Sequence, residues 1–226
     1  MGTPGLEALR NECELVSRAV LTLSEEEFER PTRCPAWNVK ELLGHMYRDV
    51  DRANTGLAAP PPPGIDTDSV SYWRRYDPAP RSQDSVDVAD RAKQIAGEFE
   101  TGSGLADAWD QMWRTAIDRA GEEDPDRHIV TWGPVLTLEE FLKTRVLEIT
   151  IHGADLADAL RRAPWASEAG VRITKEILLG LLGQELPEAL GWDDLTFVEK
   201  GSGRGAITND ERAILGSLAD RFPLMG

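Results

Sequence analysis

The chain has 226 residues, of which 41% are hydrophobic and 29% are charged, and this is enough to bury one substantial core. Its 40 acidic residues outnumber its 25 basic ones, and the formal net charge of -15 disfavours binding to nucleic acid or anionic lipid. The N-terminus has no apolar signal segment, and no later run reaches the ~20 apolar residues that a membrane span needs. Cys13 and Cys34 lack the spacing of a disulfide framework or a thiolate metal site. We therefore expect a cytoplasmic protein with reduced cysteines, as a monomer or homodimer.

Apolar residues at helical spacing predict helices in the first part of the chain. They recur every three or four positions from Leu6 to Leu23, which indicates an amphipathic helix. Ser24 is placed to cap a short helical turn that follows. The next helix is expected to begin after Asn38, which can cap it while Glu41 reaches back to the cap.

A Pro-rich, polar stretch after residue 57 predicts an irregular surface loop. One segment of this loop could line the mouth of a cleft or simply anchor the loop; it consists of Tyr72, Trp73, Arg74, Arg75 and Tyr76. A helical region is predicted over Ser85–Ala120, with a break at the glycines of the sequence ETGSG. Its second half places large apolar residues on one stripe, as core packing requires: Leu105, Trp109, Met112, Trp113 and Ile117.

The rest of the chain predicts three more helices. A loop is expected to contain an extended piece at residues 128–131 and an exposed His128. Thr137 is then expected to cap a long helix that ends at Leu160, with Glu140 as its capping-box partner. A helix is predicted for the sequence APWASEAGVRITKEILLGLLGQEL. A short strand before a glycine-rich turn is predicted in DLTFVEKGSGRGAI, and a terminal helix is predicted in TNDERAILGSLADRF. The predicted fold is mainly α, with a four-helix bundle over residues 1–162 and a small C-terminal α or α+β extension over residues 163–226.

Two histidines and one glutamate are predicted to meet inside the bundle. Glu148 and His152 lie one turn apart on an inward face of the long helix, and His45 flanks the apolar stripe of an earlier helix. Buried carboxylate and imidazole groups are costly unless they are paired or coordinated. Two nitrogens and one carboxylate oxygen suit zinc with a fourth position open, although nickel, iron or manganese would also fit. The alternative is that Glu148 pairs with Arg145 or with a neighbouring helix, and that His152 is a core histidine hydrogen-bonded to a carbonyl group.

Two motifs in this sequence resemble one family. TRCPAWNVKELLGHM and RVLEITIHGADLADAL are similar to the two signatures of the mycothiol-dependent maleylpyruvate isomerase family, a branch of the DinB-like metalloenzymes. The resemblance implies a DinB-like four-helix bundle whose metal, usually zinc, is held by His45, Glu148 and His152. It also implies that mycothiol, a low-molecular-weight thiol, serves as cofactor or cosubstrate. The C-terminal part looks too short for the extra domain of the isomerase itself, which counts against maleylpyruvate as substrate.

The leading functional hypothesis is a metal-dependent thiol transferase or isomerase that acts on an electrophilic small molecule. Asp49 and Asp155 are candidates to orient the imidazoles, or are solvated acids. Arg145 could hold a substrate carboxylate or pair with Glu148, and Arg204 could approach from the glycine-rich tail. Cys34 is expected in a structural turn rather than in catalysis.

Two rival hypotheses are also compatible with the sequence. A hydrolase would use metal-bound water, with Asp49 as its general base. A helical binding module would keep only a vestigial site.

Overall fold

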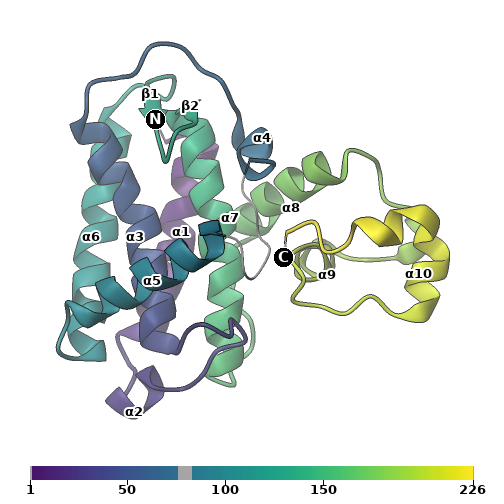
Figure 1. Cartoon of the computed structure of the whole chain (residues 1–226), viewed down its shortest axis with the longest axis horizontal. Coiled ribbons are helices and arrows are strands. Elements are labelled where there is room, and N and C mark those ends of the chain that lie inside the picture. The colour runs from purple at the N-terminus through teal and green to yellow at the C-terminus, as the bar shows by residue number, and fades with distance from the viewer. Residues whose placement is uncertain (1, 76–82, 226) are drawn as a thin grey trace.

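The computed structural model describes residues 2–75 and 83–225 (Figure 1). Within those ranges the fold contains ten α-helices and one two-stranded antiparallel sheet. The helices are α1 (Pro4–Val20), α2 (Glu25–Phe28), α3 (Val39–Ala58), α4 (Ser69–Trp73), α5 (Gln83–Gly97), α6 (Gly102–Glu122), α7 (Leu138–Ala159), α8 (Glu168–Leu182), α9 (Asp194–Gly201) and α10 (Asn209–Leu215). The strands are β1 (His128–Val130) and β2 (Val135–Thr137), and short 3-10 turns cover Glu188–Leu190 and Gly216–Arg221.

Helices α1, α3, α6 and α7 lie side by side as a bundle, with α5 crossing the outside of α3 (Figure 1). The predicted stripe on α6 is buried in the bundle core, as are the apolar faces of the other three helices. Helix α8 packs against α1 and α7, and beyond it α9 and α10 form a smaller unit with its own apolar cluster around Leu178, Phe197 and Val198. The mainly α class and the central bundle are therefore confirmed. The predicted division of the chain into a bundle domain over residues 1–162 and an extension over residues 163–226 stays a prediction.

Side-chain caps begin the helices where the sequence places them. Ser24 and Asn38 each form a complete capping box, with Glu27 and Glu41 respectively. Thr137 caps α7 by accepting a hydrogen bond from the Glu140 backbone N–H at 3.1 Å.

The expected capping-box role of Glu140 is wrong. Its carboxylate instead accepts hydrogen bonds from the Ser69 backbone N–H at 2.9 Å and from the Ser69 hydroxyl at 2.6 Å. Ser69 begins α4, a short helix inside the segment that we expected to be irregular. Glu140 therefore joins the start of α4 to the start of α7, which holds α4 over the bundle.

Two further expectations are wrong, namely the exposure of His128 and a strand after residue 193. The extended piece expected at residues 128–131 is confirmed as β1, which pairs with β2. His128, however, is half-buried rather than exposed, and its Nδ1 lies 3.0 Å from the Pro62 carbonyl oxygen. The strand expected after residue 193 is helix α9. Asp193 caps that helix by accepting from the Thr196 N–H at 2.7 Å, and Phe197 packs into the C-terminal apolar cluster.

The first testable prediction concerns the close approach of α6 to α2. A Cβ atom at Gly102 would lie 2.2 Å from the ring of Phe28, which is fully buried, so that core packing would have to shift to admit it. Gly102→Ala is therefore expected to reduce the free energy of unfolding by about 1–3 kcal/mol in chemical denaturation. Gly97→Ala is the matched control, because nothing lies within 4 Å of its Cβ position. Equal stability of the two variants would contradict this packing.

No helix in the described ranges is long and apolar enough to cross a membrane.

Candidate metal centre

The structure brings together the three predicted ligands, His45 from α3 and Glu148 and His152 from α7. The Glu148 Oε2 atom lies 3.1 Å from His45 Nε2 and 3.2 Å from His152 Nε2. One ligand atom from each of the three residues lies within 4.8 Å of the other two. All three side chains are largely buried, with 10%, 14% and 11% of their surfaces exposed for His45, Glu148 and His152. The arrangement thus offers two nitrogens and one carboxylate oxygen to a single point.

Electrostatics in the metal-free protein favour a charged cluster at this point. Burial raises the pKa of Glu148, but hydrogen bonds from His152 and His45 outweigh it and hold that pKa well below its usual range. Burial likewise lowers the pKa of His152, while hydrogen bonds with Asp155, Cys34 and Glu148 raise it well above 6.5. A carboxylate between imidazoles is therefore stabilised here in its ionised, ligand-competent form.

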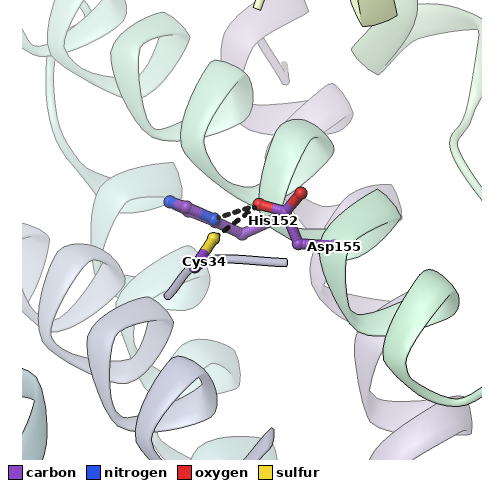
Figure 2. Close-up of side chains that lie close together, drawn as sticks. All are labelled: Cys34, His152 and Asp155. Atoms are coloured by element: carbon purple, nitrogen blue, oxygen red, sulfur yellow. Dashed lines mark hydrogen bonds and ion pairs between the residues drawn. The ribbon is translucent and has the colours of Figure 1, made fainter. Parts of the chain in front are cut away.

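Asp155 lies behind His152 and orients it, as the one-turn spacing predicts (Figure 2). Its Oδ2 atom is 2.8 Å from His152 Nδ1, and the other ring nitrogen points away from it (Figure 2). Arg33 Nε and Arg204 Nη2 also donate to this buried carboxylate, at 2.5 and 3.0 Å. Burial raises the pKa of Asp155, but His152 and Arg204 lower it far below its usual range. An ionised Asp155 keeps the proton on Nδ1 and leaves Nε2 to face Glu148.

Cys34 also lies at the site, which sequence reasoning missed. The expected turn is present, because the Trp37 N–H donates to the Cys34 carbonyl oxygen at 3.0 Å. The thiol nevertheless lies on the Asp155 side of His152, with Sγ 3.2 Å from Asp155 Oδ2 (Figure 2). Cys34, His152 and Asp155 therefore form a second group that could hold a metal ion. The two groups share His152, whose Nε2 faces Glu148 and whose Nδ1 faces Asp155.

Asp49 and Arg145 lie beside the candidate metal centre as an ion pair. Asp49 Oδ2 is 3.3 Å from His45 Nε2, the same nitrogen that faces Glu148, so Asp49 does not orient His45 from behind as we expected. Its Oδ1 atom is 3.0 Å from Arg145 Nη1. The predicted pairing of Arg145 with Glu148 is therefore wrong. The buried guanidinium of Arg145 instead contacts Asp49 and donates to the Tyr72 hydroxyl oxygen at 3.4 Å.

Trp37 is a further residue of the site that the sequence analysis did not single out. Its ring stacks on His45, with centroids 4.7 Å apart and planes 21° from parallel. Its indole Nε1 donates to the Ala89 carbonyl oxygen of α5 at 3.4 Å. The available signal was a tryptophan directly before the Asn38 cap, at the start of the helix that carries His45.

Comparison with known proteins identifies the family. The family model described as the mycothiol maleylpyruvate isomerase N-terminal domain matches residues 9–157, which hold His45, Glu148 and His152. The chain belongs to this family. No curated protein matches the sequence.

A solved structure shows how far the likeness of fold extends. A crystal structure of a histidine-to-alanine mutant of the mycothiol-dependent maleylpyruvate isomerase superposes with a TM-score of 0.57 at 13% sequence identity. The alignment covers 91% of this chain and 93% of that chain. We expected the C-terminal part to be too short for the isomerase's extra domain. That expectation is wrong, because the similarity of fold extends over nearly the full length of both chains.

In this family member the candidate metal centre opens onto a cavity of about 1320 Å³. Helices α3, α4, α5 and α7 and the C-terminal unit all contribute to its lining. Arg204 reaches the cavity from the tail, as predicted. Of the segment expected at a cleft mouth, Tyr72, Trp73 and Arg74 line the cavity, Arg75 pairs with Asp66 instead, and Tyr76 lies outside the described residues.

Proposed function

We propose that this protein is a metal-dependent transferase or isomerase that uses mycothiol, as cosubstrate or cofactor, with an electrophilic small molecule. The observation that supports the proposal most directly is the convergence of His45, Glu148 and His152 at the wall of a large cavity. Membership of the mycothiol maleylpyruvate isomerase N-terminal domain family supports the choice of thiol. A cytoplasmic location and a monomeric or homodimeric state remain part of the proposal.

The residues present fit a divalent metal. His45 and His152 both direct Nε2 toward Glu148, and Asp155 already satisfies Nδ1 of His152. Two nitrogens and one carboxylate oxygen suit zinc and leave a position open, while nickel, iron and manganese share this preference. When bound, the metal would lower the pKa of a coordinating thiol so that it is held as thiolate.

The chain's own residues would hold and orient the reacting groups. Asp155 fixes the tautomer of His152, and the stacked ring of Trp37 restricts rotation of His45. Arg204 adds a positive charge at the cavity wall, with Nη2 3.9 Å from Cys34 Sγ. A cavity that holds both reactants provides proximity, so that conjugate addition of a thiol needs little further acid or base chemistry.

Hydrolysis is the second candidate function. It needs a general base beside the open position, and Asp49 is the acid nearest to His45 apart from Glu148. Because Asp49 is engaged by Arg145 at 3.0 Å, it is poorly placed to act as a free base. This pairing favours the thiol reaction over hydrolysis.

Cobalt-substituted protein tests the proposed function. Mycothiol is expected to produce a sulfur-to-cobalt charge-transfer band and to support turnover in a screen of electrophiles, with adducts detected by mass spectrometry. No spectral change and no turnover would exclude the thiol reaction. Turnover of esters or amides without thiol would support the hydrolase instead. Absence of stoichiometric metal in protein purified without a His tag would support a vestigial site.

The second testable prediction concerns Asp155. Asp155→Asn removes the charge that holds the His152 Nδ1 proton, so zinc affinity is expected to fall about 10–100-fold in competition with a chromophoric chelator. Asp158→Asn is the matched control, since it removes an exposed carboxylate from the same helix, α7. Equal zinc affinities of the two variants would contradict an orienting role for Asp155.

The third prediction is a pH dependence of zinc binding. The pKa of His152 is raised well above 6.5 in the metal-free protein, because its hydrogen bonds outweigh the effect of burial. Below that pKa the imidazole carries a proton that zinc must displace, so zinc affinity is expected to weaken as the pH falls. Calorimetry in buffers of different ionisation enthalpy should detect proton release at neutral pH. Binding without proton release would contradict the prediction.

A further inference from the structure

A second cavity, of about 100 Å³, lies between the bundle and the C-terminal unit. Residues of α7 line it from the bundle, among them Ile151 and Ala154, and residues of α9 line it from the C-terminal unit, among them Leu195 and Val198. Its volume is less than a tenth of that of the cavity at the candidate metal centre. It therefore has room for a few water molecules or one small ion, but not for a substrate together with a thiol.

Two N–H donors of the residues that line this second cavity lack a hydrogen-bond partner. Arg33 Nη2 and Trp165 Nε1 are both buried, and neither has a partner in the described part of the chain. A buried N–H group without a partner lowers stability, so nearly all such groups in proteins are bound by protein atoms, by water or by an ion. Two of them at one small cavity indicate a bound species that accepts hydrogen bonds.

The glycine at position 153 lets the Trp165 indole lie close to α7. A Cβ atom at Gly153 would be 3.3 Å from Trp165 Nε1, which is tighter than ordinary van der Waals contact. Trp165 itself belongs to the loop between α7 and α8. Because Gly153 directly follows His152, the indole N–H lies beside the turn of α7 that carries the candidate metal centre.

The charges around the second cavity favour an anion over a neutral molecule. Arg33 Nε and Arg204 Nη2 both donate to Asp155, at 2.5 and 3.0 Å, and both arginines line the cavity. Two guanidinium groups thus share one buried carboxylate, which balances only one of their two positive charges. Glu199 also lines the cavity, but it forms no ion pair with either arginine among the residues that the structure describes.

We propose that the second cavity binds a small monovalent inorganic anion of the halide class, such as chloride. A halide has no proton of its own to place, so it accepts from Arg33 and Trp165 without needing an acceptor from the aliphatic part of the lining. The bond from the guanidinium is charge-assisted, and a guanidinium is weakly hydrated, which lowers the cost of burying it beside an anion. In this position the anion lies between Arg33 of the bundle and α9 of the C-terminal unit, and it helps to hold the two together.

Chloride titration followed by nitrogen-proton correlation spectra of the purified protein tests this inference. Chloride replaces gluconate at constant ionic strength, because gluconate is too large for a cavity of about 100 Å³. The Trp165 indole resonance, identified by its loss in Trp165→Phe, is expected to shift saturably. The indole N–H groups of Trp109 and Trp113 donate to Ser17 Oγ in the bundle core, so their resonances are internal controls that should not move.

A charge-neutral variant tests the part played by the guanidinium. Arg33→Gln is expected to weaken chloride binding about tenfold, as loss of a charge-assisted hydrogen bond would. Arg30→Gln is the matched control, since Arg30 lies in the same loop, pairs with Glu27 and does not line the cavity. This control should bind chloride as the wild type does.

Two results in solution would overturn the inference: a Trp165 resonance that does not respond to chloride, or equal chloride affinities of Arg33→Gln and the wild type. Bromide-soaked crystals of the wild type give a second measurement that does not depend on how well a variant folds. An anomalous peak within hydrogen-bond distance of Arg33 Nη2 and Trp165 Nε1 is expected. Water molecules at this position, without an anomalous peak, would also overturn the inference.

Discussion

Replacing Arg145 with methionine is expected to lower the free energy of unfolding by about 3–5 kcal/mol. The Arg145 and Asp49 side chains are only 1% and 6% exposed, and their atoms are 3.0 Å apart. Methionine fills much of the arginine volume, so the expected loss comes from the uncompensated Asp49 charge rather than from a cavity. Urea denaturation of the metal-free protein, with a chelator present, measures this effect without a contribution from bound metal.

A double variant separates charge from packing. Asp49→Asn combined with Arg145→Met removes both charges, and it is expected to be more stable than Arg145→Met alone. If the double variant is as unstable as the sum of the two single variants, the pair is not coupled. That outcome would contradict the assignment of Asp49 as the partner of Arg145.

The second large effect is expected at Glu148. Glu148→Gln preserves the shape of the side chain but removes the anionic ligand between the two imidazoles. Zinc bound after dialysis is expected to fall from one ion per chain to background, with an affinity loss greater than the roughly 10–100-fold expected for an orienting residue such as Asp155. Elemental analysis measures the stoichiometry, and circular dichroism checks that the fold is retained.

Asp158→Asn again provides the charge-matched comparison on α7, and it should retain one zinc ion per chain. Stoichiometric zinc in Glu148→Gln would show that the carboxylate is not a ligand. The same variant with added mycothiol should show no sulfur-to-cobalt band, because the thiol would have no metal to bind.

Features set by local sequence could be predicted well. The caps at Ser24, Asn38 and Thr137 depend on a side chain and a backbone N–H three residues later, so they are visible in a short window. The helical period also predicts that Glu148 and His152 share a face, and that Asp155 can reach His152. These relations hold within one or two helical turns.

Features set by packing between distant segments could not be predicted. Local spacing favoured Glu148 as the partner of Arg145, but the packing of α3 against α7 brings Asp49 to it. Cys34 and Arg33 reach Asp155 from a loop more than a hundred residues earlier, whose path has no periodic signal. The segment after Asp193 has the short apolar run of a strand, and its packing through Phe197 into the C-terminal apolar cluster favours a helix; the cap at Asp193 was a local signal for that helix.

X-ray absorption spectroscopy of zinc-loaded protein in thiol-free buffer tests the metal centre most directly. If His45, Glu148 and His152 hold the ion, the first shell should contain only nitrogen and oxygen at about 2.0–2.2 Å, with imidazole scattering from two histidines. A sulfur scatterer at about 2.3 Å would place the ion instead in the group of Cys34, His152 and Asp155. That result, or a protein that retains no zinc, would contradict the proposed site.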